Sequence, residues 1–162
     1  MKWQVREAKI TDYSGAVALM QEVYLLHYRQ RPDLHKKVDK PLTKTEFKEI
    51  LAAEQQILLV VIAVPFNEVA AICQLDLKDT FENENLVNRR YAYLNDLCVA
   101  KKYRRQGLGK LLYQAAAAKL KELEILELEL TVWSFNQSAA DFYQELGFKP
   151  RYTLLEHKLD NK

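Results

Sequence analysis

Residues 91–109 read YAYLNDLCVAKKYRRQGLG, and this stretch decides the fold. A strand-like run at 91–99 leads into a short basic loop, and a helix-forming segment follows from Lys110. Glycines let the backbone turn and approach a phosphate closely. The first N–H groups of a helix have no partner inside it, and the helix dipole adds positive charge there. The junction therefore predicts a phosphate-binding site.

The spacing of the glycines excludes two common phosphate motifs. A P-loop needs four residues between its first glycine and a Gly-Lys-Ser/Thr, which this segment does not contain. A dinucleotide fingerprint needs a third glycine where Leu112 stands. The pattern that is present is Arg104-x-x-Gly107-x-Gly109, with basic side chains around it at Lys101, Lys102, Arg105 and Lys110. A solvated charge run would be the plain explanation, but the adjoining glycines favour a phosphate ligand.

A second pattern lies at 128–148, LELTVWSFNQSAADFYQELGF. It consists of a strand, then Asn136, then Ala-x-x-Phe-Tyr-x-x-x-Gly-Phe. Taken alone, it is explained by an amphipathic helix with an asparagine cap and a stop at Gly147.

Together the two patterns resemble motifs A and B of the GNAT acetyltransferase superfamily. The matching residues are Asp96-Leu97-Cys98-Val99, Arg104, Gly107 and Gly109 in motif A, and Asn136, Ala139, Phe142, Tyr143, Gly147 and Phe148 in motif B. The resemblance implies an N-acetyltransferase that moves an acetyl group from acetyl-CoA to a primary amine of a small molecule or peptide, by direct attack in a ternary complex. A non-catalytic acyl-CoA sensor of the same fold remains an alternative, and a nucleotide-binding regulator is a weaker one.

The order of predicted elements indicates a mixed α/β sheet in three layers. Strands are expected at 3–9, 57–64, 69–78, 91–99, 125–132 and 152–159, and helices at about 12–29, 44–54, 110–123 and 136–146. The resemblance implies the GNAT acyltransferase fold, in which a central mixed sheet with splayed strands is flanked by helices. We expect one domain over residues 1–162.

The resemblance also assigns the contacts to coenzyme A. The pantetheine arm would pair with the backbone of Leu97, Cys98 and Val99, where two strands separate. The pyrophosphate would lie on the backbone amides and side chains of Arg104, Arg105, Gln106, Gly107, Leu108, Gly109 and Lys110. Asn136 would lie near the cofactor arm and Tyr143 at the thiol end, and no metal is expected.

Catalysis needs a base, an oxyanion donor and an acid. A backbone N–H at Leu97 or Cys98 could stabilise the oxyanion, and Tyr143 could protonate the leaving thiolate. Asp96 is the expected base, because Asn95 stands where many relatives have the first of two carboxylates. Strand alternation puts Asp96 on the face opposite Asn95, although a bulge could turn either side chain. A structural role for Asp96, with His27 or His35 as base through water, remains open.

The resemblance places the acceptor among the segments 24–35, 79–93 and 149–153. The expected contacts are Tyr24, His27, Tyr28, Tyr93 and Asn95. The stretch DTFENEN at 79–85 is acidic and would attract a cationic amine.

Composition narrows the class of protein. The 162 residues are 49% hydrophobic and 28% charged, as in soluble globular proteins. A net charge of +2 argues against nucleic acid or a membrane as partner. Cys73 and Cys98 lie in apolar runs, which suits buried thiols and a cytoplasmic location. The N-terminus lacks a signal-peptide core, and the apolar run at 57–66 is too short to span a bilayer. Dimers are frequent in the superfamily, which leaves a homodimer open.

Overall fold

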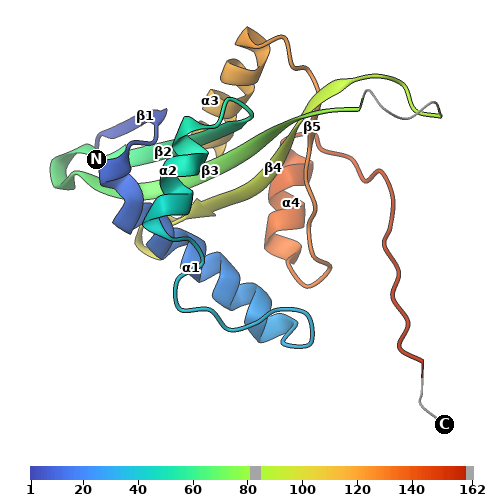
Figure 1. Ribbon diagram of the computed structural model, residues 1–162. Helices are drawn as coiled ribbons and strands as arrows, with labels where there is room; N and C mark the ends of the chain where they lie inside the picture. Colours follow the sequence, from blue (N-terminus) through green and yellow to red (C-terminus); the bar gives the residue numbers. More distant parts are fainter. Residues whose placement is uncertain (81–84, 160–162) are drawn as a thin grey trace. The chain divides into compact units, whose positions relative to one another are not determined.

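The computed structural model describes residues 1–80 and 85–159 (Figure 1). The chain forms two compact units, Met1–Leu130 and Thr131–Lys162, and each is described by itself. Among the described residues, no helix combines the length and the apolar composition that crossing a membrane requires.

The first unit contains a mixed sheet of five strands in the order β1-β2-β3-β4-β5 within the described residues. Neighbouring strands from β1 to β4 are antiparallel, whereas β5 is parallel to β4. The mixed sheet that the sequence predicts is therefore confirmed. The strands are β1 (Trp3–Glu7), β2 (Gln56–Ala63), β3 (Glu68–Asp79), β4 (Arg90–Val99) and β5 (Leu128–Glu129).

Helices cover both faces of this sheet. Helices α1 (Tyr13–Gln30) and α2 (Lys44–Ala52) lie on one face, and α3 (Leu108–Glu122) lies on the other (Figure 1). Because both faces are covered, β2 is buried at every position from Ile57 to Ala63. This burial explains why its sequence is a continuous apolar run rather than an alternating one.

Local polar contacts fix the 3-10 turn Ile10–Asp12 before α1 and the start of α2. Asp12, just before α1, accepts two hydrogen bonds from the Arg6 guanidinium, at 2.6 and 2.9 Å, and one from the Lys9 backbone N–H at 2.7 Å. Thr43 begins α2 with a reciprocal cap, because its hydroxyl accepts from the Glu46 N–H while the Glu46 carboxylate accepts from the Thr43 N–H.

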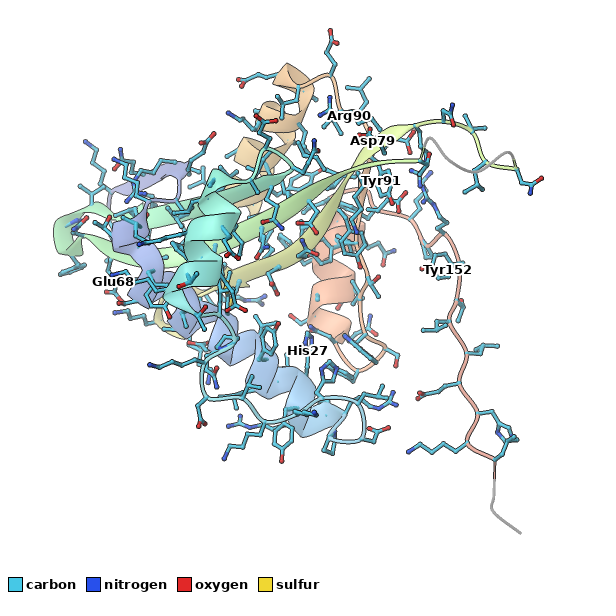
Figure 2. The ribbon with its side chains drawn as sticks, viewed as in Figure 1. His27, Glu68, Asp79, Arg90, Tyr91 and Tyr152 are labelled. Atoms are coloured by element: carbon cyan, nitrogen blue, oxygen red, sulfur yellow. The ribbon has the colours of Figure 1, made fainter. Side chains whose placement is uncertain are left out.

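Two strands predicted from the sequence differ in the structure. Within 125–132, only Leu128 and Glu129 are paired as a strand. Residues 152–159 form no regular secondary structure, so the prediction of a final strand there is wrong. The four large apolar side chains of this segment, Tyr152 (Figure 2), Leu154, Leu155 and Leu159, are between 78% and 88% exposed. Alternation of side chains specifies faces, but a strand also needs a partner for its backbone groups.

The second unit contains α4 (Gln137–Glu145). The Asn136 side chain accepts a hydrogen bond from the Ala139 N–H at 3.2 Å and caps the helix. At the other end Gly147 adopts a left-handed φ of 92°, and the Phe148 N–H donates to the Tyr143 carbonyl at 3.0 Å. The asparagine start and the glycine stop predicted for this helix are both confirmed.

Candidate functional site

Strand β4 is paired along one edge and only partly along the other. On the β3 side the pairing runs from Arg90 to Val99, but β5 pairs with β4 only at Ala92 and Tyr93. From Leu94 to Val99 this second edge therefore has no strand partner among the described residues. Backbone amides and carbonyls at such an edge can pair with an extended ligand that carries amide groups. The expected pantetheine contacts Leu97, Cys98 and Val99 lie in this stretch. Because hydrogen-bonded pairs alternate along β3 and β4, the backbone groups of Leu97 and Val99 face this edge, whereas those of Cys98 face β3.

The loop after β4 leads into an uncapped helix start. Gly107 precedes α3 with a left-handed φ of 79°, and Arg105 also has a positive φ of 62°. No side chain of the described residues caps this helix, so the N–H groups of its first turn, from Leu108 onward, are available at the positive end of the dipole. The exposed residues around it are Arg104, Arg105, Gln106, Gly107 and Lys110, and Gly109 is partly exposed. This arrangement suits an anion.

Arg104 joins three elements. Its Nε donates to the Val99 carbonyl of β4 at 3.0 Å, and its Nη2 lies 3.2 Å from the Glu22 carboxylate of α1. In the neighbouring 3-10 turn (Lys101–Tyr103), Lys102 pairs with Glu68 of β3 at 2.7 Å. These contacts hold the loop against the sheet, which leaves Arg105 and Lys110 as the stronger candidates for contact with a phosphate.

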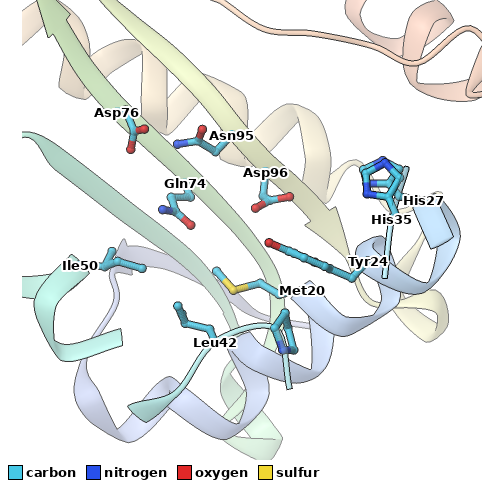
Figure 3. Close-up of a pocket in the computed structure, with 11 residues that line it drawn as sticks. Met20, Tyr24, His27, His35, Leu42, Ile50, Gln74, Asp76, Asn95 and Asp96 are labelled. Atoms are coloured by element: carbon cyan, nitrogen blue, oxygen red, sulfur yellow. The ribbon is translucent and has the colours of Figure 1, made fainter. Parts of the chain in front are cut away.

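A pocket of about 470 Å³ lies between the β3–β4 face and the elements that cover it (Figure 3). Its volume is in the range of small-molecule sites. Four polar side chains from the two strands form the floor: Gln74, Asp76, Asn95 and Asp96. The walls come from α1, the 31–43 segment and α2: Met20, Tyr24, His27, His35, Pro41, Leu42 and Ile50.

A β-bulge at Asn95 builds this floor. Leu94 pairs with Leu75 and Asp96 with Gln74, so Asn95 has no counterpart on β3. Strict alternation would separate Asn95 and Asp96 to opposite faces, yet both line the pocket. The prediction that Asn95 and Asp96 lie on opposite faces is therefore wrong, and the alternative prediction, a bulge that turns one of these side chains, is confirmed.

Burial and neighbouring charge tune the polar groups of the pocket. Burial raises the pKa of Asp96 above its ordinary value. The pKa of Tyr24 is also raised, by burial and then by the negative charge of Asp96. The Tyr24 hydroxyl points toward the Asp96 carboxyl (Figure 3). A carboxylate with a raised pKa is a stronger proton acceptor, which suits a general base.

Two histidines stack at the pocket wall. The rings of His27 and His35 lie 5.3 Å apart between centroids, at an interplanar angle of 30°. Burial lowers the pKa of His27, and the charge of His35 lowers it further. A lowered pKa favours the neutral imidazole, which can accept a proton.

The structure brings together part of the predicted acceptor site. Tyr24, His27 and Asn95 line the pocket, whereas Tyr28 and Tyr93 are not among its lining residues. Of the acidic stretch 79–85, residues 81–84 lie outside the described residues. Sequence reasoning missed Gln74 and Asp76, although two polar residues at alternate positions of an apolar strand are a readable signal.

Both cysteine thiols are buried. Burial raises the pKa of both Cys73 and Cys98 to about 12, so neither is a reactive thiolate.

In the second unit, the Tyr143 ring packs edge-on against Phe142 and Phe148, at centroid distances of 5.2 and 5.4 Å. The cofactor role of Asn136 and the acid role of Tyr143 stay predictions.

Known proteins show the same pattern of sequence and fold. A model of the Acetyltransferase (GNAT) family matches residues 20–148. An L-ornithine N5-acetyltransferase, NATA1 of Arabidopsis thaliana, is 36% identical over 55 residues, which are 34% of this chain and 24% of that protein. The match thus spans about a quarter of that relative's length.

Solved structures agree over nearly the whole chain. A point mutant of the BH1408 protein from Bacillus halodurans superposes with a TM-score of 0.91 at 27% identity, covering 96% of this chain and 99% of that one. Glucosamine-6-phosphate N-acetyltransferase from Arabidopsis thaliana shares the fold, with a TM-score of 0.72 at 16% identity over 99% of this chain and 100% of that one. The family match covers most of the chain and includes both motifs. The chain therefore belongs to the acetyltransferase (GNAT) family, whose acetyl donor is acetyl-CoA.

Proposed function

We propose that this protein transfers an acetyl group from acetyl-CoA to an amine bound in the pocket. The observation that carries the proposal is the position of Asp96 on β4. The same strand has an edge without a strand partner among the described residues, from Leu94 to Val99, and it continues through the basic loop into the start of α3. An amine beside Asp96 and a thioester along that edge would therefore meet on one strand.

Coenzyme A is bound mainly through backbone groups of β4 and α3. The pantetheine amides pair with Leu97 and Val99, on either side of Cys98, where β4 has no partner from β5. The pyrophosphate accepts hydrogen bonds from the first N–H groups of α3, with Arg105 and Lys110 supplying positive charge.

In the reaction, Asp96 takes a proton from the bound ammonium group. The free amine attacks the thioester carbonyl and forms the C–N bond, and the backbone N–H of Leu97, which faces the edge without a strand partner, stabilises the oxyanion. Collapse of the tetrahedral intermediate breaks the C–S bond, and Tyr143 donates a proton to the coenzyme A thiolate. The proton that the new amide nitrogen releases passes through solvent and restores Tyr143. His27 or His35 is the alternative base, acting through water.

The acceptor is proposed to be a primary amine of a small molecule or peptide. The pocket favours a cation because Asp76 and Asp96 line it and, among the described lining residues, none is lysine or arginine. The similarity over 55 residues to an L-ornithine N5-acetyltransferase supports an amine on an aliphatic chain.

An acyl-CoA sensor without turnover is the second candidate. One observation favours it: Asn95 stands in the pocket where many members of the superfamily have a carboxylate. Release of coenzyme A thiol from acetyl-CoA with pooled polyamines, aminoglycosides, amino acids and peptides separates the two functions. We expect release with at least one pool and its loss in Asp96→Asn. Acetyl-CoA binding with silence in every pool would favour the sensor.

We propose that both units belong to one acetyltransferase domain, because the family match at 20–148 crosses the boundary after Leu130. The unpaired, buried thiols of Cys73 and Cys98 suit a reducing compartment, which supports a cytoplasmic location.

We also propose a homodimer in which the exposed apolar segment 152–159 packs against a second copy. Light scattering should give twice the 19.0 kDa chain mass, and the double variant Leu154→Asp/Leu155→Asp should give the single mass. Phe66→Asp is the matched control, because Phe66 is also exposed, at 63%, but lies in the turn between β2 and β3. A wild-type monomer, or a dimer that survives the double variant, would contradict the proposal.

A further inference from the structure

We infer that the acceptor amine carries a second cationic group and that Asp76 binds it. The inference rests on the proposed function and names a substrate class for the same pocket: aliphatic diamines. The pocket holds two carboxylates, and the proposed chemistry uses only Asp96.

The register of the sheet sets the separation of the two carboxylates. Asp96 is directly opposite Gln74, and Asp76 lies two residues further along β3 on the same face. Diagonal neighbours of this kind lie about 7–8 Å apart. Figure 3 shows Asp76, Gln74 and Asp96 on the floor in that order. A short aliphatic chain with an amine at each end can place one nitrogen beside each carboxylate.

Asp76 is held in position by a neighbour from β2. The Gln56 Nε2 donates a hydrogen bond to Asp76 Oδ1 at 3.2 Å. This bond orients the carboxylate and leaves Oδ2 for the ligand. Gln56 is thus a positioning residue, and Asp76 is the residue that distinguishes a diamine from a monoamine.

The wall opposite the floor suits the carbon chain between the two nitrogens. Met20, Leu42 and Ile50 line this side of the pocket with apolar atoms (Figure 3). An apolar wall over two separated carboxylates is complementary to a molecule that is cationic at both ends and apolar between them.

The test compares two amines with the same four-carbon chain, putrescine and n-butylamine. In the wild type, kcat/KM for putrescine should exceed that for n-butylamine about tenfold or more, since a charge-assisted hydrogen bond is added. Asp76→Asn should reduce this ratio toward one, mainly through KM for putrescine. Glu7→Gln is the matched control: Glu7 is a carboxylate at the end of β1 that does not line the pocket, and its variant should keep the wild-type ratio.

The outcomes separate this inference from the proposed function. Equal kcat/KM values for the two amines in the wild type, or an unchanged ratio in Asp76→Asn, would overturn the role of Asp76 while acetyl transfer stands. No thiol release with any amine would contradict acetyl transfer instead. Calorimetric titration of putrescine into the coenzyme A complex then decides the inference without turnover. Binding weakened about tenfold by Asp76→Asn supports it, and binding unaffected by that variant, or absent, overturns it.

Discussion

Gly107 and Gly147 form a matched pair that tests the phosphate loop. Both adopt left-handed φ angles, 79° and 92°, and a Cβ added at either would meet no heavy atom within 4 Å. Gly107 precedes α3 in the proposed pyrophosphate site, whereas Gly147 follows α4. Replacing either glycine by alanine should therefore cause a similar backbone strain, but only Gly107→Ala should weaken the binding of acetyl-CoA.

Backbone strain sets the expected fall in Tm, and lost hydrogen bonds to the phosphate set the expected rise in Kd. A left-handed L-residue costs about 1–2 kcal/mol, so each variant should unfold about 2–8 °C lower than the wild type. For Gly107→Ala we expect in addition the loss of one or two hydrogen bonds to the phosphate, each worth about 1.5–3 kcal/mol. The Kd for acetyl-CoA should then rise about tenfold to a hundredfold or more.

Two measurements on the same samples check this reasoning. Thermal unfolding without ligand should give similar Tm shifts for Gly107→Ala and Gly147→Ala. Calorimetric titration with acetyl-CoA should give weakened binding only for Gly107→Ala. Equal Kd values for the two variants would refute the assignment of the loop as the pyrophosphate site.

The remaining predictions concern the base, the acid and one partly buried ion pair. Burial raises the pKa of Asp96, so kcat/KM of the wild type should rise as pH passes through that pKa. In Asp96→Asn, kcat/KM should not change over this pH range and should be about a hundredfold lower or more. An unchanged profile would move the base elsewhere. Tyr143→Phe should lower kcat about tenfold or more and leave the Kd for acetyl-CoA unchanged; normal turnover would reject Tyr143 as the acid. Burial acts to raise the pKa of Asp12, but hydrogen bonds from Arg6 and Lys9 lower it below its ordinary value. Denaturation at neutral pH should thus show Asp12→Asn less stable by about 1–3 kcal/mol. That difference in stability should fade as pH falls below about 4. A carboxyl group whose pKa is lower in the folded than in the unfolded protein stabilises the fold fully only above its unfolded pKa.

Local sequence patterns determined much of this protein. The apolar runs at 57–64 and 69–78 specify strands covered on both faces, and the Asn136 and Gly147 signals define the ends of α4. The glycine spacing after β4 identified the loop and, with the second motif, the family. These features depend on neighbours a few residues apart, so the chain alone carries them.

Tertiary structure decided the acceptor pocket. Only the register between β3 and β4 reveals the bulge that turns Asn95 and Asp96 to the same side and brings Gln74 opposite Asp96. It also decided that Arg104 is held by Glu22, a residue 82 positions away in the chain. Alternation within 125–132 could not show that only two residues find a partner strand. The physical reason is common to these cases: register, bulges and ion pairs depend on which segments meet in space, and a periodic pattern records only which side chains share a face.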